Sequence, residues 1–249
     1  MKDNKDILGD ILDVVGGDQS VTYIAFVQDH SGSMKNILPG TNNQTKADMA
    51  KTNFNEYIVT LKKESAEDME TLVTLIEFDD TIRCTDHKLI KEVEPMSGYW
   101  TGGMTALYDA IAKSIGELSR AMAKDTRTNK AALVIIQTDG DENYSQEYKG
   151  RDGQKKLQKY ISELEETGLW TFVFLGEDID EKLAEDIGMT PKNFMKTEAT
   201  GQSYAMTGSI VQDGLSKYYG DRKRGMTQSK AFFDKDEDDK NETGPGDGS

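Results

Sequence analysis

The stretch Val21–Met34 reads VTYIAFVQDHSGSM and decides the fold of this chain. It opens with a run of apolar, β-branched and aromatic residues, a pattern typical of a buried strand. The run ends at Asp29, Ser31 and Ser33, which places oxygen-bearing side chains at the carboxyl end of that strand. Ligands of open α/β sheets bind at this edge, and hard divalent cations prefer oxygen ligands. The stretch therefore predicts a strand that ends in part of a metal site.

Two later segments bring oxygen-bearing side chains to strand or helix ends in the same way. The segment GGMTALYDAI places Thr105 at the start of a predicted helix, and Gly102-Gly103 leave the backbone free to bring it in. The apolar run Ala131–Gln137 ends at Asp139 in the sequence VIIQTDG. Asp-Ser-Gly clusters alone are common in ordinary turns. The prediction of a site is more specific here because three separate loops each present oxygen-bearing side chains at the end of a strand or the start of a helix.

The rest of the chain alternates predicted strands with predicted helices. We expect strands near residues 21–28, 72–78, 81–85, 131–137, 169–175 and 193–196. We expect helices near residues 47–61, 107–122, 155–166, 179–187 and 203–219. Such alternation implies parallel strands with helices on both faces of the sheet. The short turn between the second and third strands makes that pair antiparallel.

These motifs resemble those of the von Willebrand factor type A (vWA) family. The resemblance rests on D-x-S-x-S at residues 29–33, the threonine loop and the TDG strand ending, and it extends from about Ser20 to Tyr219. It is to the intracellular prokaryotic or phage type of vWA protein. It implies a Rossmann-like α/β fold, with a mostly parallel central sheet, one short antiparallel edge strand and helices on both faces.

The resemblance also implies a metal ion-dependent adhesion site (MIDAS). Its ligands would be Asp29, Ser31, Ser33, Thr105 and Asp139, and its ion Mg²⁺, with Mn²⁺ or Ca²⁺ as alternatives. In the family the two aspartates often reach the metal through water, so the ion keeps much of its positive charge and seeks an anionic oxygen. A competing interpretation is that Asp29, Ser33 and Asp139 cap helices and turns. That interpretation does not account for oxygen clusters at three separate loops.

The function expected from the resemblance is a divalent-cation-dependent protein-binding module, serving as an adaptor or in assembly. Its partner would offer an Asp or Glu carboxylate, and a ring ATPase or a multi-protein assembly is the suggested setting. In several family members the last helix moves when the metal site is engaged, and residues 203–219 match that helix here. An acidic partner residue and a movable helix are therefore what the resemblance implies for this chain.

Two other classes of function stay open: a Mg²⁺-dependent hydrolase or phosphoryl-transfer enzyme, and a structural protein with a vestigial metal site. We expect no enzyme. The sequence contains no P-loop, and Lys35 is the only basic residue close in sequence to the metal motifs. The only two histidines, His30 and His87, exclude a His-rich catalytic metal centre. We expect His30 to be an exposed loop residue and His87 to lie in a surface turn.

Composition limits the partners. The 249 residues include 30 Lys and Arg against 45 Asp and Glu, a formal net charge of −15. Such a surface repels phosphates, which argues against nucleic acid and anionic membranes as partners. The single cysteine, Cys84, allows neither an intramolecular disulfide nor a Cys-based zinc site. No apolar run approaches the roughly 20 residues of a membrane span, and the N-terminus lacks a signal-peptide core. We expect a cytoplasmic protein, with a virion as the alternative location.

We expect one vWA domain over residues 20–222. Residues 1–19 form an N-terminal extension with an amphipathic helix, which either docks on a partner or packs back on the domain. Residues 223–249 become acidic and then Gly-rich, and we expect a disordered tail. Phe232-Phe233 are either a short peptide motif or the last residues to touch the domain.

Residues that flank the predicted site have two interpretations. Tyr99 and Trp100 either form an aromatic contact surface around the metal or pack under the threonine loop. Asp141, Glu142 and Asn143 either tune partner choice or form an ordinary exposed turn.

Overall fold

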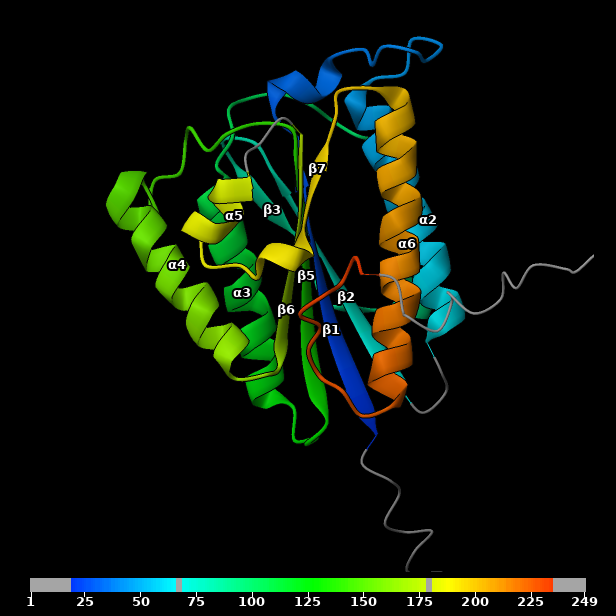
Figure 1. Cartoon of the computed structure of the whole chain (residues 1–249), viewed down its shortest axis with the longest axis vertical. Coiled ribbons are helices and arrows are strands. Elements are labelled where there is room, and N and C mark those ends of the chain that lie inside the picture. The colour runs from blue at the N-terminus through cyan, green and yellow to red at the C-terminus, as the bar shows by residue number, and fades with distance from the viewer. Residues whose placement is uncertain (1–18, 66–68, 178–180, 235–249) are drawn as a thin grey trace, which may run out of the picture.

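β1 (Ser20–Asp29) lies in the middle of the sheet in this computed structural model, which describes residues 19–65, 69–177 and 181–234. It pairs in parallel with β2 (Met69–Phe78) on one side and with β5 (Lys130–Thr138) on the other. The parallel sheet continues through β6 (Trp170–Glu177) and β7 (Phe194–Thr197). The carboxyl ends of these strands meet at one edge of the sheet, the upper end in Figure 1.

The other edge of the sheet is antiparallel. β3 (Ile82–Cys84) folds back on β2, as the short turn predicts. A further two-residue piece, β4 (Lys88–Leu89), also pairs antiparallel with β2 and was not predicted, because two residues carry no periodic signal. Cys84 lies exposed on β3. The predicted α/β fold, with a mostly parallel sheet and a short antiparallel edge, is confirmed.

Helices cover both faces of the sheet (Figure 1). Their bounds are α2 (Lys46–Glu64), α3 (Leu107–Lys124), α4 (Gly150–Glu166), α5 (Glu181–Asp186) and α6 (Gly201–Lys223). α2 and α6 lie on one face, and α3, α4 and α5 lie on the other. Short 3-10 turns occur at Gly32–Lys35, Ile90–Glu92 and Pro191–Asn193. α4 begins before its predicted start because residues 150–154 include two glycines, which weaken the helical signal.

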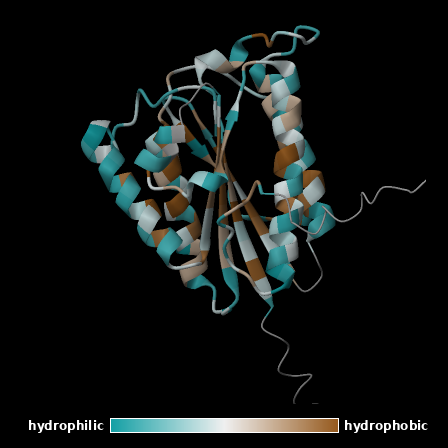
Figure 2. Cartoon of the chain, viewed as in Figure 1, coloured by the Kyte–Doolittle hydropathy of each residue, from teal (hydrophilic) through white to brown (hydrophobic). Residues whose placement is uncertain are grey.

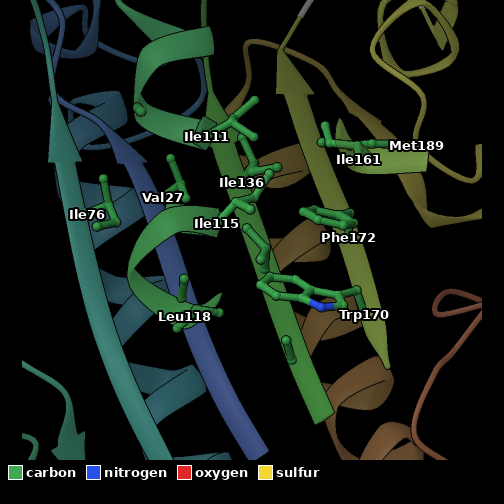
Figure 3. Close-up of a cluster of buried hydrophobic side chains, with 14 of the residues drawn as sticks. Val27, Ile76, Ile111, Ile115, Leu118, Ile136, Ile161, Trp170, Phe172 and Met189 are labelled. Atoms are coloured by element: carbon green, nitrogen blue, oxygen red, sulfur yellow. The ribbon is translucent and has the colours of Figure 1, made fainter. Parts of the chain in front are cut away.

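Burial on both faces explains why β1 is nearly all apolar. Ile24 and Phe26 pack toward α2 and α6, whereas Ala25 and Val27 belong to the core under α3 and α4. Figure 3 shows Val27 in that second core with side chains of β2, α3, β5, α4 and β6. Figure 2 shows the same division, with hydrophobic strands at the centre and hydrophilic residues on the outer helix surfaces.

A capping box fixes the start of α2. Thr45 accepts a hydrogen bond from the backbone N–H of Asp48, and the Asp48 carboxylate accepts one from the backbone N–H of Thr45. Lys46 is therefore the first helical residue, and it is buried at the carboxyl edge of the sheet. This position matters for the site described below.

The packed part of the chain extends past residue 222, so the expectation of a disordered tail from residue 223 is wrong as far as residue 234. The side-chain amide of Gln228 donates to the carbonyls of Glu165 and Trp170, and Phe232 is buried against Gly214 of α6. A polar anchor such as Gln228 leaves no apolar period in the sequence, whereas the contact of Phe232 with the domain agrees with the expectation for that residue. The predicted N-terminal helix and the tail from residue 235 lie outside the described residues.

In the described part of the chain, no helix combines the length and apolar character that crossing a membrane would need.

Candidate metal site

Backbone hydrogen bonds join the three predicted loops. Gly32 N–H donates to the carbonyl of Gly103 (3.2 Å), and Gly102 N–H donates to the carbonyl of His30 (2.9 Å). The carbonyl of Thr105 accepts from the N–H groups of Asn143 and Tyr144, at 3.1 and 3.2 Å. The loops after β1, before α3 and after β5 are thereby held together at the carboxyl edge of the sheet, where α/β proteins bind ligands.

Four of the five predicted residues form one hydrogen-bonded chain, in which Asp29 takes part through the backbone N–H of Ser31. The Asp29 carboxylate accepts from Ser31 N–H (2.7 Å), and the Ser31 and Ser33 hydroxyl oxygens are 3.1 Å apart. The Ser33 hydroxyl donates to Asp139 Oδ1 at 2.7 Å. Asp139 thus meets the first motif although 106 residues separate it from Ser33.

The fifth residue, Thr105, lies beside this chain. Its hydroxyl oxygen is 3.7 Å from the place that a Cβ on Gly140 would occupy, so it faces the loop of Asp139. Its backbone N–H donates to Asn143 Oδ1 (2.9 Å), which fixes the loop at this residue. The structure therefore brings all five predicted residues to one place; that they bind a metal stays a prediction.

The donor set fits a hard cation. It consists of hydroxyls and carboxylates, which are the oxygen ligands that Mg²⁺ prefers. Because the Ser33 hydroxyl gives its proton to Asp139, Ser31 is the donor between the two hydroxyls, and one lone pair of Ser33 stays free to face an ion. Among the described residues no group of three or more His, Cys, Asp or Glu side chains gathers as a metal cluster. The candidate metal ligands are instead three hydroxyls and two carboxylates.

Asp29 is buried under the site and held by its own neighbours. Its second oxygen accepts from the Thr138 hydroxyl at 2.5 Å. Burial raises the pKa of Asp29 to about 6, although the hydrogen bonds from Thr138 and Ser31 oppose the rise. A cation close by would favour the ionised carboxylate, because an opposite charge offsets the cost of burial.

Lys46 is a basic residue at the site that sequence reasoning missed. Its ammonium lies 2.8 Å from Asp139 Oδ2 and also bonds to Glu177 Oε1 at the end of β6. Lys35, the basic residue named from the sequence, is exposed instead. The expectation that only Lys35 lies beside the motifs is therefore wrong. The capping pattern T-x-x-D at Thr45 was the available signal, because it places Lys46 in the first turn of a helix.

His30 is fully buried, so the expectation of an exposed loop residue is wrong. Its ring stacks on Tyr99 with centroids 3.8 Å apart and lies 4.3 Å from the ring of Trp100. Burial lowers the pKa of His30 to about 4, so the imidazole is neutral at neutral pH.

Tyr99 and Trp100 pack beside the threonine loop, which favours the second of their two interpretations. The Tyr99 hydroxyl donates to the carbonyl of Asp29 (2.5 Å), and the guanidinium of Arg83 lies 3.9 Å from the Trp100 ring centroid. His87 is only partly buried, and its ring bonds to the Thr74 hydroxyl of β2.

Glu142 and Asn143 do more than form an exposed turn, because they hold the threonine loop in place. Asn143 accepts from Thr105 N–H, and the Glu142 carboxylate accepts from Tyr108 N–H (2.9 Å) and the Ser145 hydroxyl (2.7 Å). Asp141, between this pair and the site, is exposed.

Comparison with known proteins rests on structure alone, since no family model and no curated protein matches the sequence. The pilus adhesin SpaC from Lactobacillus rhamnosus GG superposes with a TM-score of 0.59 at 14% identity, covering 80% of this chain and 31% of the adhesin. A von Willebrand factor type A protein from Catenulispora acidiphila gives a TM-score of 0.53 at 14% identity, over 81% of this chain and 43% of that one. This chain has the vWA fold.

A third similar structure is proximal thread matrix protein 1 from the mussel byssus, described as having a zinc-occupied MIDAS motif. Its TM-score is 0.50 at 18% identity, and the match covers 81% of this chain and 46% of that one. The chain therefore spans less than half the length of each of these three proteins. Similarity at this level of identity shows the vWA fold alone.

The raised pKa of Asp29 makes a pH dependence testable. Below about pH 6 the carboxyl is protonated and no longer offers its negative charge to a nearby cation, so Mg²⁺ affinity should fall by up to about tenfold for each further pH unit. In the metal-free protein the folded pKa lies above the unfolded one. The stability that Asp29 contributes is therefore present at low pH and lost as the pH rises through about 6. Calorimetric titration with MgCl₂ from pH 5 to 8 measures the first effect, and an affinity that stays flat from pH 7 to 5 would contradict it.

Proposed function

We propose that this chain is a divalent-cation-dependent protein-binding module that recognises an Asp or Glu carboxylate of a partner. The ion would be Mg²⁺, held by the hydroxyls of Ser31, Ser33 and Thr105 with Asp29 and Asp139 behind them. The observation that carries the proposal is the convergence of these five side chains from three loops. Bound Mg²⁺ would supply a positive centre whose coordination an anionic oxygen can complete.

The hydrogen bonds of the two aspartates support this assignment of roles. Asp29 accepts from Ser31 N–H and the Thr138 hydroxyl, and Asp139 accepts from the Ser33 hydroxyl and Lys46. Each carboxylate oxygen is thus already engaged by a donor of the chain. The hydroxyls are then the direct ligands, and because they are neutral they leave the charge of the ion largely uncancelled.

The surface around the site supports a partner with apolar residues next to its carboxylate. Met104, directly before Thr105, is 46% exposed, and Tyr144, which bonds to the carbonyl of Thr105, is 39% exposed. Ile37, in the loop after the first motif, is 60% exposed. Protein interfaces combine apolar contacts of this kind with a few polar anchors. The ring ATPase or multi-protein assembly suggested by the sequence resemblance stays a proposal.

Neither histidine is placed to serve as a catalytic base, so we propose no enzymatic activity. His30 Nδ1 lies 2.7 Å from the carbonyl of Trp100, and its ring lies against two aromatic rings. His87 bonds to Thr74 of β2. A cytoplasmic location stays a prediction from the sequence.

The proposal is tested by capture from the native cell. The tagged full chain should retain a protein partner in 5 mM Mg²⁺, which is about the excess needed to fill a weak Mg²⁺ site, and should release it in EDTA. The Ser33→Ala variant should retain none, because it lacks a predicted ligand. Acid-to-amide substitutions in the captured partner should then abolish binding at one position. Capture that is equal with Mg²⁺ and with EDTA would contradict the proposal.

A further inference from the structure

Lys46 is a cation built into the candidate metal site itself. Its ammonium lies 2.8 Å from Asp139 Oδ2, and its side chain is 10% exposed, whereas that of Asp139 is fully buried. The capping box at Thr45 fixes the backbone of Lys46, and burial keeps its side chain from moving as an exposed lysine would. The Asp139 carboxylate therefore accepts two hydrogen bonds at once: Oδ2 accepts from Lys46 and Oδ1 from the Ser33 hydroxyl.

Glu177 balances the charge of Lys46 from the far side. Its Oε1 accepts from Lys46, and its Oε2 accepts from the Tyr204 hydroxyl of α6 at 2.6 Å. The Glu177 side chain is 4% exposed, so little water screens these charges. The buried charges next to the hydroxyl ligands thus alternate as Asp139 negative, Lys46 positive and Glu177 negative.

We propose that Lys46 sets the affinity of the site for its cation by holding Asp139 away from direct coordination. The inference rests on the proposed function, because it concerns the same ion. While Lys46 occupies Oδ2, Asp139 orients the Ser33 hydroxyl and does not neutralise the ion. Lys46 thus weakens metal binding and keeps the bound ion attractive to a partner carboxylate. Glu177 opposes Lys46 and strengthens metal binding.

Two single substitutions should therefore change metal affinity in opposite directions. Lys46→Met removes a positive charge beside the ion, and we expect Mg²⁺ to bind about tenfold more tightly in calorimetric titration. Glu177→Gln leaves the charge of Lys46 less balanced, and we expect Mg²⁺ to bind about threefold more weakly. If the three residues only shaped the site, both substitutions would weaken binding, and that result would overturn the proposal.

The charge of the probe ion separates electrostatics from geometry. Because Coulomb energy scales with charge, the tenfold gain for Mg²⁺ in Lys46→Met should become about thirtyfold for the trivalent ion Tb³⁺. Lys35→Met makes the same chemical change at an exposed residue next to the first motif. We expect a change of less than about twofold for it, because solvent and salt screen exposed charges. An equal gain in Lys35→Met would assign the effect to net charge and overturn the proposal.

Thermal unfolding without metal shows whether each variant is folded. Should Lys46→Met fail to fold, Lys46→Arg and Glu177→Gln keep the proposal testable. Lys46→Arg retains the charge but changes its shape, so its Mg²⁺ affinity should not rise above that of the original protein. A tenfold gain in Lys46→Arg, or unchanged affinity in Glu177→Gln, would overturn the proposal. Failure of the proposed function looks different, because Mg²⁺ would then bind neither the original protein nor any variant.

Discussion

Replacing Ser33 with alanine is expected to weaken Mg²⁺ binding about 100-fold and to leave the protein folded. The Ser33 hydroxyl lies 3.1 Å from that of Ser31 and donates to Asp139 at 2.7 Å, so it links the first and third loops of the site. Its removal takes away a predicted ligand and leaves Asp139 Oδ1 without this donor. The side chain is partly exposed, and the fold of β1 does not depend on it. Calorimetric titration with MgCl₂ measures the loss, and circular dichroism confirms that the protein is folded.

Thr105 provides a second test with a matched control. Thr105→Val keeps the shape of the side chain and removes its hydroxyl, and we expect Mg²⁺ affinity to fall about tenfold. Thr101→Val makes the same change in the same loop and should leave the affinity within about twofold, since Thr101 belongs to no predicted ligand set. Wild-type affinity in both Ser33→Ala and Thr105→Val would show that the ion, if one binds, is held elsewhere.

The sequence predicts the fold and the convergence of the site well, for one physical reason. A strand that is buried on both faces is nearly all apolar, so the point where polar residues return marks its carboxyl end. Asp29 and Asp139 both follow such runs, in β1 and β5, which are paired neighbours in the sheet. Adjacent parallel strands bring their ends together, so no knowledge of side-chain conformation is needed to predict this meeting.

The parts that the sequence did not predict depend on contacts between elements that are distant in the chain. Lys46 reaches Asp139 across 93 residues and Glu177 across 131, and no local pattern encodes such distances. From the sequence, His30 has the features of a polar loop residue. Its burial results from packing against the aromatic residues at positions 99 and 100, which are distant in the chain. The region after α6 packs through single polar anchors such as Gln228, without a period that a sequence window could detect.

Arg222 is the anchor whose loss should damage the fold most. It lies near the end of α6, only 2% exposed, and burial lowers the pKa of its guanidinium. Four bonds join it to the start of β1 and to two turns: Nε to the Thr22 hydroxyl (3.1 Å), Nη2 to the Val21 carbonyl (3.2 Å), and Nη1 to Asn129 Oδ1 (2.9 Å) and the Met226 carbonyl (3.0 Å). Each of these acceptors is neutral. The bonds therefore stabilise the fold by satisfying buried polar groups and not by pairing charges.

Arg222→Ala is expected to lower the free energy of unfolding by about 4 kcal/mol, because it leaves a cavity and buried acceptors without donors. Urea unfolding measures the change. Arg224→Ala, an exposed residue paired with Asp221, is the matched control and should cost less than about 0.5 kcal/mol.

Arg222→Met decides which physical effect dominates at this position. Methionine fills most of the volume but donates no hydrogen bond. If the cost of burying a charge outweighed the four bonds, this variant would be more stable than the original protein. We expect it instead to be about 2 kcal/mol less stable, because the buried Val21 carbonyl and Thr22 hydroxyl lose their donor away from water. If Arg222→Met were more stable, apolar packing would be what holds α6 against β1. Burial of the guanidinium charge would then lower the stability of the fold.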